Sequence, residues 1–356
     1  MNNTLRLRQT WTIARLQLSR VFFSRRSFWV YLLAFFPSVV FLVHGIKMKV
    51  DHRFMSDQIT PAIVMESISQ GMTAEEVIKK AGDPITDRRF NPGPARHHMR
   101  TMMYFDGERE WNLFFREGVL QTRHSRPVFN FNEDRIAFAA MFQAYYLRLA
   151  VFFGCLGIFM NLFRGEMLDK TLHFWFLAPA RREVMLVGKY LAGIVTAVSI
   201  FSIGAVLSFA IMLWPYHGAQ LTAFMQSQGI SHLFSYAFAA AMACIGYGSL
   251  FLAFGLVLRN PVIPAIVIIF WENINGILPA LLQKLSVLYY AQSLCPFPIP
   301  AADITPPLPP LMRLLLSPAE PPSTATAVLG FLILTALVLW IASWIVRRLE
   351  INYSNE

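Results

Sequence analysis

Two charged and two amide side chains interrupt the apolar runs of this sequence, namely Arg148, Glu272, Asn273 and Asn275. A charge inside a membrane is costly and commonly marks a paired or functional position. At about 1.5 Å of rise per residue, Glu272 lies roughly 17 Å along a helix from Pro261. By the same rule Arg148 lies roughly 22 Å back from Phe163, at a similar depth. We therefore expect Arg148 and Glu272 to pair, with both asparagines completing a polar cluster at the pathway or at a subunit interface. A purely structural pair, or an Arg148 that snorkels to the outer surface, would explain the same residues.

A second candidate site is the loop 164–183, whose pattern predicts a short amphipathic helix that ends at Pro179. Its apolar stripe and its polar positions are, in chain order, Glu166, Leu168, Asp169, Lys170, Leu172, His173, Trp175 and Phe176. A polar loop that presents bulky apolar side chains usually does so for a protein partner. A juxtamembrane helix that rests on lipid is the alternative.

Several catalytic and nucleotide-binding motifs are absent from this sequence. No G-x-x-x-x-G-K-[ST] loop occurs, because Gly188-Lys189 lacks the upstream glycine and the following Ser or Thr. We therefore expect no nucleotide-binding site of this kind, no enzyme activity and no cofactor in this chain. H-E-x-x-H and G-x-S-x-G are also absent, which argues against a membrane protease or hydrolase. His97, His98 and His124 have no third ligand placed with them, so no metal site is predicted.

The composition indicates the class of protein in which these residues occur and the helices that carry them. Hydrophobic residues make up 55% of the 356 residues and charged residues only 15%, with a mean hydropathy of +0.46. Soluble domains are about one quarter charged, so this is the composition of a membrane protein. Six runs are long enough to cross a bilayer as helices. They are residues 28–46, 137–163, 184–214, 232–258, 262–282 and 325–346.

The charges of the short loops predict the orientation. Residues 1–27 carry arginines and no acid, the loop 164–183 is basic, and the tail 347–356 begins with two arginines. Both termini are therefore expected in the cytoplasm. Residues 1–27 should form an amphipathic interfacial helix whose partner is anionic lipid and not nucleic acid.

The polar segment 47–136 predicts a small α+β domain outside the cytoplasm. Thr73 and Glu76 form the pattern of a capping box at the start of a helix. Three strands are expected at 102–105, 110–115 and 119–123, joined by tight turns. The segment 283–324 is proline-rich and should form only short, broken helices on the outer side.

The loop 164–183 and the span layout resemble ABC-2 membrane subunits of ABC transporters. The matching residues are Glu166, Thr171-Leu172, Trp175-Phe176, Pro179, Arg182 and Gly188-Lys189. The resemblance implies an all-α polytopic membrane protein with six transmembrane helices, like ABC-2 exporters, in which this loop docks on a cytoplasmic ABC ATPase. It implies that this ATPase, a separate polypeptide, binds ATP and Mg²⁺. It also implies a homodimer or heterodimer of membrane subunits, and export. The departures are Lys170, His173 and Arg181, which bear on which ATPase would fit.

Within 47–136, Gly71-Met72-Thr73, Gly82-x-Pro84 and Gly118-Val119 resemble the SmpA/OmlA (BamE-like) domain. This resemblance implies an envelope-protein partner for the domain and a location in the inner membrane of a bacterium. The main alternative to a permease is a non-transporting envelope scaffold or sensor that acts through 47–136. A membrane enzyme is a third possibility, without a visible catalytic constellation.

Overall fold

The structure is a computed structural model that describes residues 3–22, 27–90, 99–168, 180–258, 260, 262–275, 278–297 and 322–348. The chain forms two compact units. We call Met1–Val39, Ile136–Ala210 and Ala219–Glu356 the helical unit. The sheet unit comprises Val40–Arg135 and Ile211–Gly218.

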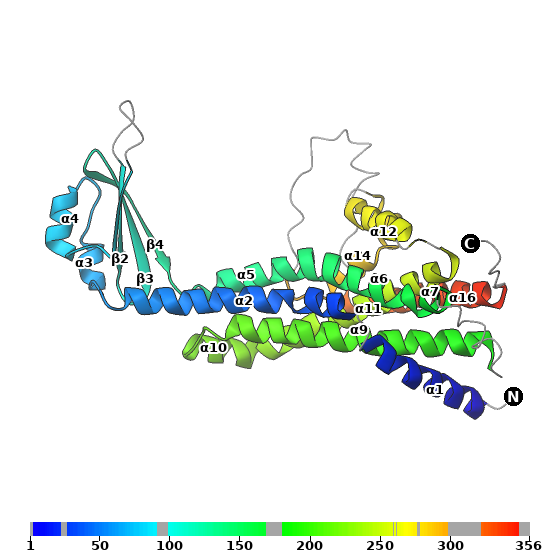
Figure 1. Cartoon of the computed structure of the whole chain (residues 1–356). Helices are drawn as coiled ribbons and strands as arrows, with labels where there is room; N and C mark the ends of the chain where they lie inside the picture. The colour runs from blue at the N-terminus through cyan, green and yellow to red at the C-terminus, as the bar shows by residue number, and fades with distance from the viewer. Residues whose placement is uncertain are drawn as a thin grey trace. The chain divides into compact units, whose positions relative to one another are not determined.

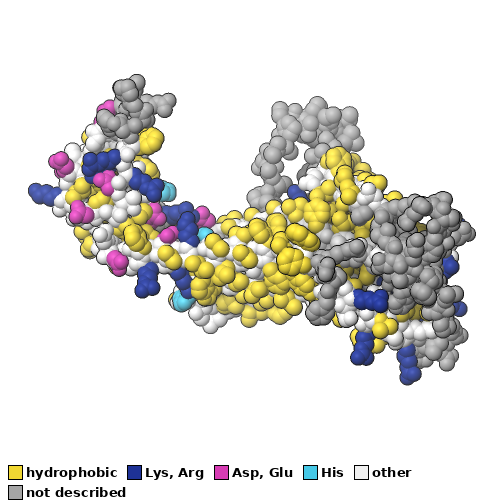
Figure 2. Space-filling model, in the orientation of Figure 1, with side chains coloured by type: hydrophobic (Ala, Val, Ile, Leu, Met, Phe, Trp, Pro, Cys, Tyr) yellow, Lys and Arg dark blue, Asp and Glu magenta, His cyan; other side chains and the backbone are white. Residues whose placement is uncertain are grey.

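Five helices in the described residues are long and apolar enough to cross a membrane. They are α2 (Ser27–Met55), the continuous helix Phe131–Phe163, α9 (Arg182–Leu213), the continuous helix Ala219–Val257 and α16 (Thr324–Arg348). The side chains over the long helices are mostly hydrophobic on the face seen in Figure 2. Such helices are typical of a polytopic membrane protein. Each overlaps a predicted span, but α2 continues past 46 to Met55 and the helix Ala219–Val257 begins before the predicted 232.

The predicted span 262–282 is different. Helix α12 (Val262–Ile274) has 13 residues, about 20 Å at the rise of an α-helix, whereas the hydrocarbon core is about 30 Å thick. Asn275 leaves the regular helix, and Pro279 precedes the short helix α13 (Ala280–Gln283). Asparagine and proline are poor residues for a helix interior, which explains the break. A six-span fold is therefore not confirmed.

Two of the long helices contain π-helical turns. The helix Phe131–Phe163 consists of α5 (Phe131–Met141), the π-helix η1 (Phe142–Val151), α6 (Phe152–Phe159) and the first part of α7 (Asn161–Leu168). The helix Ala219–Val257 consists of α10 (Ala219–Phe224), η2 (Met225–Gly229) and α11 (Ile230–Val257). The remaining helices of the unit are α1 (Asn3–Phe22) and α14 (Val287–Ser293).

Small residues let the helices approach closely. A Cβ built on Gly193 of α9 would lie 2.5 Å from the ring of Phe159 in α6, and one on Gly248 of α11 would lie 2.6 Å from it. Interfaces between membrane helices are enriched in small residues for this reason. Phe159 therefore fixes the packing of α6 against two neighbouring helices.

The sheet unit contains a four-stranded antiparallel sheet in the order β1-β2-β3-β4. The strands are β1 (Thr86–Phe90), β2 (Met99–Phe105), β3 (Arg109–Arg116) and β4 (Val119–Pro127). Three of them were predicted. The fourth, β1, was missed because its sequence Thr-Asp-Arg-Arg-Phe has four exposed positions and no apolar alternation.

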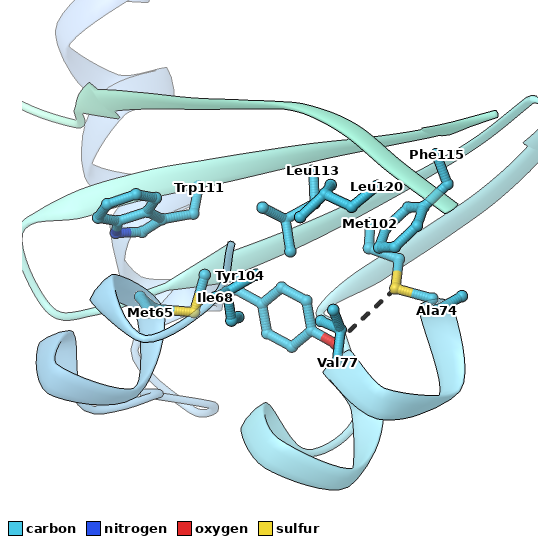
Figure 3. Close-up of a cluster of buried hydrophobic side chains, with 10 residues drawn as sticks. All are labelled: Met65, Ile68, Ala74, Val77, Met102, Tyr104, Trp111, Leu113, Phe115 and Leu120. Atoms are coloured by element: carbon cyan, nitrogen blue, oxygen red, sulfur yellow. Dashed lines mark hydrogen bonds between the residues drawn. The ribbon is translucent and has the colours of Figure 1, made fainter. Parts of the chain in front are cut away.

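One face of this sheet is covered by α3 (Ala62–Glu66) and α4 (Ala74–Ala81), as Figure 3 shows. The core between them is Met65, Ile68, Ala74, Val77, Met102, Tyr104, Trp111, Leu113, Phe115 and Leu120. The predicted capping box is present, since the Thr73 N–H donates to Glu76 Oε2 (2.8 Å) and the Glu76 N–H to Thr73 Oγ1 (3.3 Å). Arg123 ties the end of α3 to the sheet by donating to the carbonyls of Glu66 (3.3 Å) and, just after the helix, Ile68 (2.8 Å).

Candidate functional site

The carboxylate of Glu272 is buried near the end of α12 and accepts several hydrogen bonds. The hydroxyl of Ser286 donates to Oε2. The Tyr247 hydroxyl (3.3 Å) and the backbone N–H groups of Val287 (3.1 Å) and Leu288 (3.4 Å) donate to Oε1. A buried carboxylate needs such donors because desolvation of a charge is costly.

These contacts follow from the local sequence. Ser286 is the N-cap of α14 and also accepts from the Tyr289 N–H (3.0 Å). The first N–H groups of a helix have no acceptor within the helix. Glu272 supplies an acceptor for two of these N–H groups in α14, those of Val287 and Leu288. Glu272 therefore joins the end of α12, the start of α14 and, through Tyr247, the helix α11. We call Glu272, Tyr247 and Ser286 the buried cluster.

The predicted Arg148–Glu272 ion pair is not formed in the described chain. Arg148 lies half-buried in η1, and its Nε is buried without a hydrogen-bond partner among the described residues. Arg148 and Glu272 both lie within electrostatic range of Tyr247. The carboxylate of Glu272 accepts instead from Tyr247, Ser286 and the first N–H groups of α14.

The two asparagines differ in environment. Asn273 is exposed, and its side chain donates to the Ile269 carbonyl one turn earlier in α12 (2.6 Å). Asn275 is 9% exposed, and its Oδ1 has no partner among the described residues. The cluster thus includes Tyr247 and Ser286, which sequence reasoning missed. A Ser directly before a short apolar run was a detectable N-cap signal, whereas nothing near Tyr247 in the sequence marks it as a partner.

The predicted docking loop is described only at its ends. Glu166 lies in α7, and the structure describes its backbone alone. The remaining predicted residues up to the end of the loop lie outside the described residues, namely Asp169, Thr171, Leu172, Trp175, Phe176 and Pro179. Arg182 is described with its side chain.

Arg182 begins α9 and contacts the end of the last long helix. Its Nη1 donates to the carbonyls of Val346 (3.4 Å) and Arg347 (3.2 Å) in the final turn of α16. The last carbonyls of a helix lack partners within the helix, and a cation is favourable there. The neighbouring Glu183 forms an ion pair with Arg347 (2.5 Å).

Gly188 and Lys189 lie in the second turn of α9. The Lys189 side chain is fully buried and its Nζ donates to the Leu162 carbonyl in α7 (2.7 Å). A Cβ built on Gly188 would lie 2.9 Å from the Ile13 side chain and 3.0 Å from the Thr10 carbonyl, so only glycine lets α1 lie this close. Figure 1 shows α1 beside α9.

We call Arg182, Glu183, Gly188 and Lys189 the inner junction. Through these four residues the first two turns of α9 contact α16, α7 and α1. No family model, curated protein or solved structure matches the chain in the three comparisons made.

Proposed function

We propose that this chain is the permease subunit of an ATP-binding cassette transporter, of the ABC-2 type and working as an exporter. A separate cytoplasmic ATPase would bind ATP and Mg²⁺. The observation that carries the proposal is the inner junction. At this junction, the end of the loop 164–183 and the start of α9 contact three other helices, α16, α7 and α1.

The same contacts supply a route for coupling. A displacement of the loop by the ATPase would move Arg182, which holds the end of α16, and Lys189, which holds α7. A buried lysine that donates to a helix carbonyl resists separation, because an unpaired ammonium in an apolar interior is costly. The loop and the helices would therefore move together and not independently.

The remaining parts of the proposal follow the sequence. Two copies, or one copy and a relative, would form the pathway in the inner membrane of a bacterium. Both termini would be cytoplasmic, and the sheet unit would belong to the opposite side, where an envelope protein could bind it.

The test is co-purification from the native membrane. A tagged wild-type chain should retain an ATPase with a phosphate-binding loop, and the double variant Trp175→Asp/Phe176→Asp should lose it. Phe90→Asp is the matched control, because it makes the same kind of change at an exposed aromatic residue (67%) of β1, outside the loop 164–183. Absence of any ATPase from the wild-type preparation would refute the permease proposal.

One observation favours a second candidate, a non-transporting scaffold that acts through the sheet unit. The face of the sheet opposite the core exposes Phe114 (44%) and, beside it, Met99 (52%). Such a face can bind a protein partner. If the wild-type chain retains envelope proteins, and Phe114→Asp releases them while no ATPase is found, the scaffold replaces the permease.

A further inference from the structure

We propose that Arg148 binds the anionic group of a membrane-dissolved amphiphile, a phosphate or carboxylate carried by a lipid or by a transported molecule of the same chemistry. The inference rests on the helical unit alone and does not require the ATPase of the proposed function.

The first step is that Arg148 has no counter-ion among the residues that the structure describes. No described residue forms an ion pair or hydrogen bond with its side chain, and its Nε is buried. The nearest acid across Tyr247, Glu272, already accepts from two hydroxyls and two N–H groups. An arginine remains charged at every physiological pH. Within a membrane such a charge needs an anion from outside these contacts.

The second step is that Arg148 is only partly buried, although its Nε is buried. Within residues 137–163 of this helix, the exposed positions are Ala137, Ala140, Ala144 and Phe153. Arg148 follows Ala144 by four residues and is half-buried, at the border between this exposed stripe and the packed face. Three of the four exposed side chains are methyl groups, which leave room for a ligand beside the arginine.

The third step is the local backbone. Arg148 lies in the ten-residue π-helix Phe142–Val151, a rare conformation that is found frequently at functional sites. On the packed side this segment is held by Gln143, whose Nε2 donates to the Phe297 carbonyl (2.5 Å). The irregular helix is therefore held by this contact about one π-turn before Arg148.

The surroundings determine the class of ligand. The neighbours along the helix, Leu147, Leu149 and Phe153, are apolar, so a small aqueous anion would have to leave water to reach Arg148. A lipid-like molecule already places its chains against such a surface. The guanidinium forms paired hydrogen bonds with phosphate and carboxylate groups, which explains arginine at this position.

The experiment is native mass spectrometry of the full-length protein with added phosphatidylglycerol, and with diacylglycerol as the lipid without an anionic group. We expect the wild type to retain phosphatidylglycerol. Arg148→Gln should bind it roughly tenfold more weakly, because the loss of a pair of charge-assisted hydrogen bonds lowers the affinity by about this factor. Arg148→Lys should retain part of the binding. Arg88→Gln, which removes an exposed arginine of β1 in the sheet unit, is the control and should bind as the wild type does.

Three results would overturn the inference. The first is equal retention of phosphatidylglycerol by the wild type and Arg148→Gln. The second is equally tight binding of glycerol phosphate, which would show a site for a soluble anion. The third is loss of a dimer in Arg148→Gln with lipid binding unchanged, which would assign the counter-ion to a second copy of the chain.

A labelling experiment on the wild type tests the same site without any variant, so it does not depend on whether the variants fold. A photoactivatable phosphatidic acid that carries its reactive group near the phosphate should label residues 144–153. Labelling confined to other segments would refute the site.

Discussion

At the scale of single residues, the buried cluster makes Glu272 a structural acceptor. Glu272→Leu removes the acceptor of Ser286, Tyr247 and the first N–H groups of α14, and each orphaned donor costs about 1–3 kcal/mol. Glu272→Gln keeps an acceptor oxygen and should be affected less. We expect the apparent unfolding temperature in detergent to fall in the order wild type, Gln variant, Leu variant.

The neighbouring Asn273 supplies the control for this series. Its side chain is exposed and bonds within its own helix, so Asn273→Ala should unfold close to the wild-type temperature. Equal unfolding temperatures for wild type and Glu272→Leu would show that the cluster contributes nothing to stability.

The stability of the sheet unit should depend on pH because of Asp87. Hydrogen bonds from Arg100 (2.8 Å each), more than the attraction between the charges, hold the pKa of Asp87 below its ordinary 3.8. The pair links β1 to β2. Because the folded pKa is depressed, the stabilisation is complete above the unfolded pKa and is lost as pH falls through the folded value.

The measurement is pepsin cleavage within residues 86–105 of the full-length protein between pH 2 and pH 5. At pH 5 Asp87→Asn should be cleaved about fivefold faster than the wild type, corresponding to about 1 kcal/mol for a partly exposed pair. The ratio should begin to fall near pH 3.8 and approach one only below the depressed folded pKa of Asp87. A ratio that stays constant over this range would contradict the assignment.

At the scale of elements, the capping box fixes the start of α4. Thr73→Ala should destabilise this helix by about 1 kcal/mol, because the side chain no longer accepts from the Glu76 N–H. Hydrogen exchange of peptides covering 74–81 should become faster. Thr122→Ala, at an exposed position of β4, should leave that exchange unchanged.

The close approach of α1 to α9 depends on Gly188. Gly188→Leu should push α1 away and expose it to trypsin at Arg15 and Arg20. Gly165→Leu is the matched control, since a Cβ built on Gly165 has no atom within 4 Å. If both variants are cut at the wild-type rate, α1 does not depend on this contact.

Elements with strong periodicity or caps were predictable from the sequence, and those held by distant contacts were not. The capping box and three strands follow from local signals. Strand β1 exists because β2 supplies its hydrogen bonds, although its own residues are mostly charged. The break after α12 was missed because its apolar residues continue to Leu282, and hydropathy outweighed the signals of Asn275 and Pro279.

At the scale of the whole molecule, the helical unit should persist without the sheet. The ten core residues of the sheet unit come only from residues 65–120. A variant in which 58–128 is replaced by a short Gly/Ser linker should therefore insert in the membrane and still co-purify with the ATPase. A chain that is degraded, or that loses the ATPase, would show that the units depend on each other.

The site could be predicted only in part at this scale. Arg148 and Glu272 were recognisable as charges in apolar runs, and the structure assigns them to one region. Their partners could not be predicted, because they come from α11 and α14, whose register against α12 is set by packing. The inner junction likewise joins residues more than 150 positions apart, such as Arg182 and Val346.

The ring of Phe159 between Gly193 and Gly248 has a consequence for the evolution of this chain. The three positions share one small volume, so their sizes cannot change independently. In related sequences, alanine or serine at 193 or 248 should occur together with a smaller side chain at 159. Three positions far apart in the sequence should therefore covary as a group, and this covariation would report the packing of α6, α9 and α11 without any structure.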